Sequence, residues 1–221
     1  MYVQNWNICL IEIGFIARCF GLYQKFQIIN EELTVLKTNT LTKIKYPVVL
    51  RNEIRSDIIN NPKFHTLANS IELLRMKHQF ARGALRDLNK LYGTQLGLSL
   101  VFLFILGLFD IYGEVNTKDV KTRSKIFIYG WMLQYIFRCF SIIITSHFTT
   151  KQAYNTKMLL ADINNRYLDK TTKKELNLFF DQIYQGSLEF ISCDFFTLHP
   201  HLITTALYTG ITYLVVLLRI D

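Results

Sequence analysis

Long apolar stretches alternate with polar, charged segments along this chain. Residues 91–109 and 195–218 contain no Asp, Glu, Lys or Arg over 19 and 24 residues, respectively. Residues 126–150 and 1–24 are nearly as apolar, with one and two interrupting charges. A helix needs roughly 20 apolar residues to cross the hydrocarbon core of a bilayer. The pattern therefore predicts four membrane-spanning helices.

Composition and charge narrow the classes of protein that fit this pattern. The 221 residues are 50% hydrophobic and 14% aromatic, which excludes a disordered chain, and they carry a net charge of +8. A chain that is both basic and apolar is either a nucleic-acid-binding protein with a packed core or a membrane protein with charged loops. Because the apolar residues form span-length stretches, the membrane class fits better, with a soluble all-α nucleic-acid-binding protein as an alternative.

Basic residues gather on one side of the predicted spans. Of the 25 Lys and Arg, eleven lie in residues 37–96 and six in residues 151–194, whereas the short connection at 113–125 holds four. Loops rich in Lys and Arg tend to stay on the cytoplasmic side of a membrane. We therefore expect the first two segments to be cytosolic, and the N-terminus, the 113–125 connection and the C-terminus to be extracellular.

The cytosolic segments carry a helical pattern of their own. Residues 73–95 place Leu73, Phe80, Leu88 and Leu91 on one side of a helix, with arginines on the other. The predicted fold is an all-α membrane protein of four long transmembrane helices with cytosolic helical extensions. In chain order we expect a helix at 1–36, a cytosolic loop at 37–71, a helix at 72–112 with an amphipathic start, an extracellular turn at 113–124, a helix at 125–168, a cytosolic segment with a short helix at 169–194, and a final helix at 195–221.

Three short runs carry a more specific signal: LNKLYGTQL at 88–96, SCDFFTL at 192–198 and TYLVVLL at 212–218. The last run resembles the Thr-Tyr and five-aliphatic motif that closes insect gustatory receptors, a family of seven-span chemoreceptors. The other two resemble that family's Leu-Asn-x-x-Tyr-Gly-x-Gln-Leu and small-Cys-Gly-Phe-Phe-x-Leu runs. Their order and spacing agree with family spans four to seven, and the main matched motif residues are Phe195, Phe196, Thr212 and Tyr213.

The resemblance implies a plasma-membrane receptor with an extracellular C-terminus. Members of this family form ligand-gated cation channels for small-molecule tastants, and they assemble as tetramers whose final span lines the pore. They are also longer, with three further spans before the part matched here. No basic n-region or cleavage site marks residues 1–14 as a secretory signal, so an extracellular start suggests missing upstream spans. We therefore expect the chain to be a fragment of a homo- or hetero-tetrameric receptor subunit; a fragment of another polytopic protein, such as a transporter, is the alternative.

The final span supplies the expected pore face. Arg219-Ile220-Asp221 stands where the family has Gln-Phe, and helical spacing puts Arg219 on the same face as Tyr208. In a tetramer this places four arginines around the outer mouth, where they oppose cation passage. Alternatively, each Arg219 extends to the lipid headgroups. The predicted pore-lining residues are Tyr208, Thr212, Val215, Val216, Arg219 and Ile220.

Two charges fall near the middle of predicted spans. An unpaired charge there costs roughly 2.5–3.5 kcal/mol, so we expect Glu12 and Arg138 to pair inside the helix bundle. Closer to the outer ends of the spans, a few polar side chains are candidates for lining a ligand pocket. These are Asp110, Tyr112, Tyr129 and Gln134.

Other kinds of site find little support. Cys9, Cys19, Cys139 and Cys193 show no CxxC spacing, and the two histidines of His199-Pro200-His201 diverge on a helix. The sequence has no phosphate-binding glycine loop, HExxH or GxSxG motif. We therefore expect no metal, cofactor, enzymatic activity or nucleic-acid partner, and we attribute the basic residues beside the spans to contact with membrane lipid.

Overall fold

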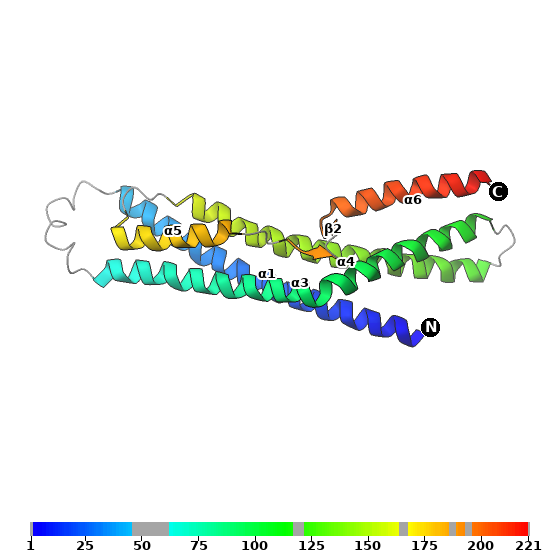
Figure 1. Ribbon diagram of the computed structural model, residues 1–221, viewed down its shortest axis with the longest axis horizontal. Coiled ribbons are helices and arrows are strands. Elements are labelled where there is room, and N and C mark those ends of the chain that lie inside the picture. Colours follow the sequence, from blue (N-terminus) through cyan, green and yellow to red (C-terminus); the bar gives the residue numbers. More distant parts are fainter. Residues whose placement is uncertain are drawn as a thin grey trace. The chain divides into compact units, whose positions relative to one another are not determined.

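The computed structural model describes residues 2–45, 62–116, 122–163, 168–185, 189–192 and 196–220. Most of these residues lie in α-helices, joined near the C-terminal end by two short strands (Figure 1). Strands β1 (Ile191–Ser192) and β2 (Phe196–Thr197) pair antiparallel, a hairpin that the sequence pattern did not predict. The helices are α1 (Tyr2–Lys45), α3 (Pro62–Asn116), α4 (Thr122–Ala161), α5 (Lys170–Tyr184) and α6 (His201–Ile220).

The expected all-α membrane class is confirmed. Within the described residues, three stretches are long and apolar enough to cross a membrane: Trp6–Thr38, Leu67–Val115 and Ile126–Ala161. The apolar part of α6, His201–Leu217, is shorter. The whole of α6 has 20 residues, which at 1.5 Å per residue is about 30 Å, the thickness of the hydrocarbon core.

Several helix ends differ from the predicted boundaries. The final helix begins at His201 rather than at residue 195, because the chain first forms β2 and the Leu198 N–H donates to the Phe190 carbonyl at 2.9 Å. Both ends of the predicted loop at 37–71 are helical, since α1 continues to Lys45 and α3 begins at Pro62. The middle of that loop lies outside the described residues. The predicted turn at 113–124 is likewise helical at both ends, since α3 continues to Asn116 and α4 begins at Thr122, and residues 117–121 lie outside the described residues.

The chain divides into two compact units, and α1, α3 and α4 contribute residues to both. The first unit comprises Met1–Phe20, Asp87–Phe148 and Glu189–Asp221, so it contains the hairpin and α6. Its fully or nearly fully buried side chains come from every part of it and include Phe15, Leu96, Ile142 and Phe190. This unit contains the site described below.

The second unit comprises Gly21–Arg86 and Thr149–Leu188. In its core, the buried His78 ring lies edge-on to Phe26 and Phe179, with ring centroids 5.6 and 5.5 Å away. The Asn30 side chain links α1 to α4 by donating to the Gln152 carbonyl at 2.9 Å and accepting from the Thr156 hydroxyl at 2.7 Å. These hydrogen bonds satisfy polar groups that are buried between the helices.

The buried face of α3 matches the predicted one only in part. Leu88, in the first unit, is buried as expected, whereas Leu91 is 73% exposed. Leu73 and Phe80 were expected to face inward, but they are 54% and 79% exposed. Arg82 is buried instead, and its guanidinium donates to the Gln182 and Gln185 carbonyls at the C-terminal end of α5. The negative end of a helix dipole attracts such a charge, so an arginine marks the inner face here. The residues buried on this face are Ile71, Leu74, His78, Ala81, Arg82 and Leu85.

Candidate functional site

A buried ion pair joins α1 to α4 in the first unit. Arg138 donates from Nε to Glu12 Oε2 at 2.7 Å and from Nη2 to Oε1 at 2.8 Å. Ser99 of α3 donates a further hydrogen bond to the same carboxylate. Glu12 and Arg138 are 3% and 9% exposed, so each needs the other to offset the loss of hydration. The structure thus brings together the two charges that the sequence analysis paired.

Two of the three motif runs also meet in this unit. The Asn89 side-chain oxygen accepts from the Ile191 N–H at 3.1 Å, and the Ser192 hydroxyl donates to the Gly93 carbonyl at 2.7 Å. A Cβ at Gly93 would lie only 3.0 Å from the Ile191 carbonyl oxygen. The glycine therefore allows β1 to lie directly against α3. The contact anchors the hairpin that leads into α6.

The neighbouring motif tyrosine connects this junction to α1. The Tyr92 ring lies 5.8 Å from Phe15, measured between centroids, and Arg18 Cζ lies 5.3 Å from the Tyr92 centroid. Phe15 in turn meets Phe190 edge to face at 5.6 Å. These ring contacts pack the start of the hairpin against two helices, and the Phe15–Phe190 pair has the edge-to-face geometry that aromatic rings prefer.

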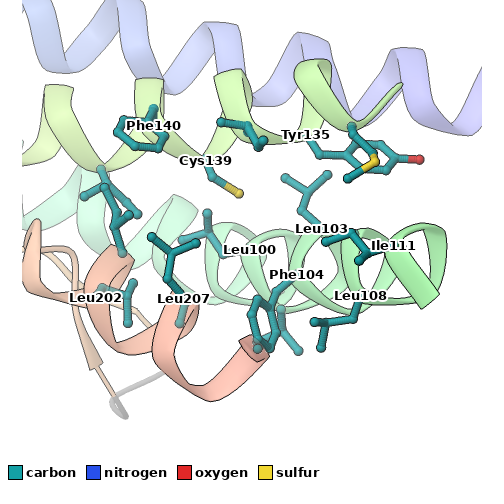
Figure 2. A pocket seen from close by; sticks show the side chains of 18 of the residues that line it. Leu100, Leu103, Phe104, Leu108, Ile111, Tyr135, Cys139, Phe140, Leu202 and Leu207 are labelled. Atoms are coloured by element: carbon teal, nitrogen blue, oxygen red, sulfur yellow. The ribbon is translucent and has the colours of Figure 1, made fainter. Parts of the chain in front are cut away.

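An apolar cavity of about 390 Å³ lies among α3, α4 and α6 of the first unit (Figure 2). Tyr135 and Cys139 bring the polar side-chain groups of its lining, and Figure 2 shows the Cys139 sulfur directed into the space. The lining residues are Leu100, Val101, Leu103, Phe104, Gly107, Leu108, Ile111, Met132, Tyr135, Ile136, Cys139, Phe140, Ile143, Phe196, Leu202, Ile203, Ala206, Leu207, Gly210, Ile211 and Leu214.

One wall of this cavity lies where α6 packs against α3 at Gly210. A Cβ at Gly210, a buried position, would lie 3.3 Å from Leu108 Cδ2 and 3.4 Å from Phe104 Cε2. The first distance is tighter than ordinary van der Waals contact, and the second lies at its lower limit. The absence of a side chain at residue 210 therefore sets how near the two helices pack, and a molecule in the cavity would touch both of them.

The polar residues predicted to line a ligand pocket lie elsewhere. Asp110, Tyr112, Tyr129 and Gln134 are not among the residues that line the α3–α4–α6 cavity, although Ile111 is. Tyr129 is 55% exposed, and Gln134 borders a separate surface hollow with Phe127 and Trp131. This cavity is built mainly from apolar side chains that recur every three or four residues, so polar residues in the sequence do not mark it.

The residues predicted to line a pore share an exposed face of α6. Tyr208, Val215 and Val216 are 77%, 59% and 52% exposed, and Thr212 and Arg219 are exposed as well. At 100° per residue this face points away from Ile203, Ala206 and Gly210, which line the cavity. Of the motif residues, Tyr213 is exposed and Phe196 half-buried. Phe195 and the side chain of Ile220 lie outside the described residues.

The histidines and cysteines do not form a metal-binding cluster in the part of the chain that the structure describes. His147 and His199 do meet, with ring centroids 4.9 Å apart. The His201 backbone N–H donates to His199 Nδ1 at 3.3 Å, and the His201 ring nitrogen Nδ1 lies 3.2 Å from the Thr205 hydroxyl of its own helix. Within the described residues, Cys9, Cys19 and Cys139 take part in no disulfide, and Cys193 lies outside the described residues.

Apolar helices of membrane-spanning length, linked by a buried ion pair, define a polytopic helical membrane protein. Residues 7–221 match the family described as 7tm Chemosensory receptor, and the chain belongs to this family. Among solved structures, it is similar to the insect olfactory receptor OR5 from Machilis hrabei in complex with eugenol, with 13% sequence identity and a TM-score of 0.56. The match covers 97% of this chain and 70% of that chain, and it shows a shared fold. No curated protein matches the sequence.

Proposed function

We propose that this chain is a subunit of a ligand-gated cation channel of the gustatory-receptor type, which responds to small-molecule tastants. Membership of the chemosensory receptor family supports a receptor role. The olfactory receptor of similar fold was determined in complex with eugenol, which supports a small-molecule ligand. The subunit sits in the plasma membrane with its C-terminus outside, assembles as a homo- or hetero-tetramer, and acts by binding rather than by catalysis.

The observation that carries this proposal is the division of α6 into two opposite faces. One face, with Ala206 and Gly210, lines the apolar cavity. The other face, with Tyr208, Thr212 and Val215, is exposed in the single chain. In a tetramer with α6 at its centre, the exposed face surrounds the ion path. A ligand in the cavity then contacts α6, the helix that lines the ion path. If the ligand binds the open channel more tightly than the closed one, its binding favours opening of the channel.

Voltage-clamp recording from oocytes that express the 221-residue chain tests the channel proposal. We expect inward cation currents that appear on addition of an active compound from a panel of sugars, phenols and other small organic molecules. Surface labelling of an epitope tag at the C-terminus verifies delivery and orientation. If the tagged chain reaches the surface and no compound or related subunit produces a cation current, the channel proposal is wrong.

A pair of neighbouring cysteine substitutions tests the pore face. In Thr212→Cys, a cationic methanethiosulfonate reagent added outside should reduce the current, because residue 212 faces the ion path. In Tyr213→Cys, about 100° further around the helix, the same reagent should leave the current unchanged. Tyr213 is exposed in the single chain as Thr212 is, so the pair separates facing the ion path from simple exposure. Equal block of both variants would contradict the assigned face.

A further inference from the structure

We propose that His147 and His199 form a binding site for a divalent transition-metal ion such as Zn²⁺, which joins α4 to the start of α6. The two rings meet within the first unit, with centroids 4.9 Å apart and an angle of 89° between their planes. Imidazole nitrogen is a preferred ligand of Zn²⁺, Cu²⁺ and Ni²⁺ in proteins. The site is separate from the apolar cavity, whose lining includes neither histidine.

The separation of the two rings suits a shared ion. Zn²⁺ binds imidazole nitrogen at roughly 2.0–2.1 Å and favours a tetrahedral arrangement of its ligands. Two imidazoles held in this way have ring centroids about 5 Å apart, close to the 4.9 Å between His147 and His199. The two side chains can therefore take up an ion by turning their rings, while the backbones of α4 and α6 stay in place.

Both histidines lie at the end of an apolar stretch rather than in its middle. His147 stands three residues before the end of the stretch 126–150, and His199 precedes α6, which begins at His201. His199 is exposed and His147 is half-buried. Polar groups at the end of a membrane span meet the headgroup region, where water is present. A hydrated ion can therefore reach the pair.

Metal binding requires the release of one hydrogen bond. The His201 N–H donates to His199 Nδ1 at 3.3 Å, which is longer than the usual distance of about 2.7–3.2 Å. This N–H belongs to an exposed residue at the start of α6, where water can accept from it in place of the ring. The His199 ring can therefore turn toward an ion at small cost.

Water completes the coordination of the proposed ion. In the part of the chain that the structure describes, no third His, Cys, Asp or Glu joins the pair to make a group of three. A site with two protein ligands holds its ion less tightly than a structural site with four. We therefore expect reversible binding of Zn²⁺, and no binding of Mg²⁺, which prefers oxygen ligands.

Calorimetric titration of the tag-free 221-residue chain with Zn²⁺ tests the site. The chain is held in phosphatidylcholine nanodiscs, and empty nanodiscs serve as the blank. His147→Gln and His199→Gln should each weaken Zn²⁺ binding by at least about tenfold, because each removes one of two protein ligands. Titration with Mg²⁺ should show no binding.

His201→Gln is the matched control for the titration. His201 is also exposed and lies two residues from His199, but its ring nitrogen Nδ1 lies 3.2 Å from the Thr205 hydroxyl. Its replacement should leave the Zn²⁺ affinity within about twofold of the unchanged chain. Thermal midpoints recorded without metal should agree among the three variants, which verifies that each one folds.

Cu²⁺ provides a second measurement, because it takes the same nitrogen ligands with higher affinity. At one equivalent of Cu²⁺, the nitrogen modulation in pulsed electron paramagnetic resonance counts the bound imidazoles. We expect two bound imidazoles in the unchanged chain and in His201→Gln. We expect one in His147→Gln and in His199→Gln.

Three results would overturn the inference. The first is a Zn²⁺ affinity that both His147→Gln and His199→Gln leave unchanged, and the second is an equal loss of affinity in His201→Gln. The third is a single bound imidazole in the unchanged chain with Cu²⁺. Each would reduce the two rings to a packing contact between α4 and the start of α6. These measurements need no ion current, so their outcome and that of the channel proposal are independent.

Discussion

Arg138 of α4 holds Glu12 of α1 by two hydrogen bonds of 2.7 and 2.8 Å, and both side chains are buried. A charge alone in the middle of a membrane span costs roughly 2.5–3.5 kcal/mol. Pairing through two parallel bonds offsets much of that cost and fixes the rotation of both helices. Ser99 donates to the same carboxylate, so three helices of the first unit are tied at this point.

Removing one partner should therefore be worse than removing both. Glu12→Gln and Arg138→Gln should each destabilise the folded chain by about 3 kcal/mol, because each leaves one buried charge without its partner. The double variant should recover at least half of this loss. Fluorescence-detected size-exclusion chromatography after heating in detergent measures the surviving fraction. If the double variant survives no better than the weaker single variant, the pair does not stabilise the fold.

Two glycines of α3 should respond in opposite ways to alanine. Gly93→Ala places a Cβ 3.0 Å from the Ile191 backbone oxygen, so it should destabilise the junction by about 1–3 kcal/mol. Gly83→Ala meets no atom within 4 Å and should stabilise the helix by about 0.5–1 kcal/mol. Thermal unfolding midpoints in detergent measure both. A Gly93→Ala midpoint at or above that of the unchanged chain would show that β1 does not need this close approach.

Neutralising Arg219 tests the charge at the end of α6. Arg219 is exposed in the last turn of the helix. If four such charges surround the ion path, Arg219→Gln should raise the cation conductance, by about tenfold for each 1.4 kcal/mol removed from the barrier. Arg219→Lys keeps the charge and should conduct like the unchanged chain. Cation conductance that disappears in Arg219→Gln would contradict the barrier, and no change in either variant would favour contact with lipid headgroups.

The start of α5 should lose stability in acid. Asp169 caps this helix, with its carboxylate accepting from the Thr172 N–H at 3.1 Å and from the Thr171 hydroxyl. Burial opposes ionisation, but these hydrogen bonds outweigh it and lower the pKa of Asp169 below its ordinary value. A lowered pKa stabilises the fold above the unfolded value, near pH 4, and this stabilisation is lost as the pH falls through the folded value.

Hydrogen exchange of the α5 amides, corrected for intrinsic rates, measures this dependence. Asp169→Ala should speed exchange in the first turn about fivefold at neutral pH, corresponding to about 1 kcal/mol for a lost cap. Asp169→Asn keeps a capping oxygen and should retain most of the protection while losing its acid dependence. Protection in Asp169→Asn that still falls below pH 4 would assign the acid dependence to another group.

Much of the first unit was predictable because polar atoms inside a membrane need partners. Glu12 and Arg138 stand out as charges in apolar stretches. The free energy that an unpaired charge costs inside a membrane was enough to predict that they pair. The motif runs at 88–96 and 192–198 were recognisable as a family pattern, but their hydrogen-bonded contact through Asn89 and Gly93 was not. The α3–α4–α6 cavity is lined mainly by apolar residues, so polar positions such as Asp110 and Gln134 do not mark it in the sequence.

The sequence by itself determined the class of protein, three of the long helices and the family to which the chain belongs. The length of an apolar stretch, a charge within it and a short motif are properties of the local sequence. They can be recognised without knowing which residues are in contact. Only the tertiary structure decided which helix faces meet and where the cavity lies. Of one predicted inner face, Leu88 is buried but Leu73 and Phe80 are exposed. The physical reason is that lipid is as apolar as a protein core. A hydrophobic pattern in a membrane helix therefore does not distinguish a side chain that faces lipid from one that lines a cavity.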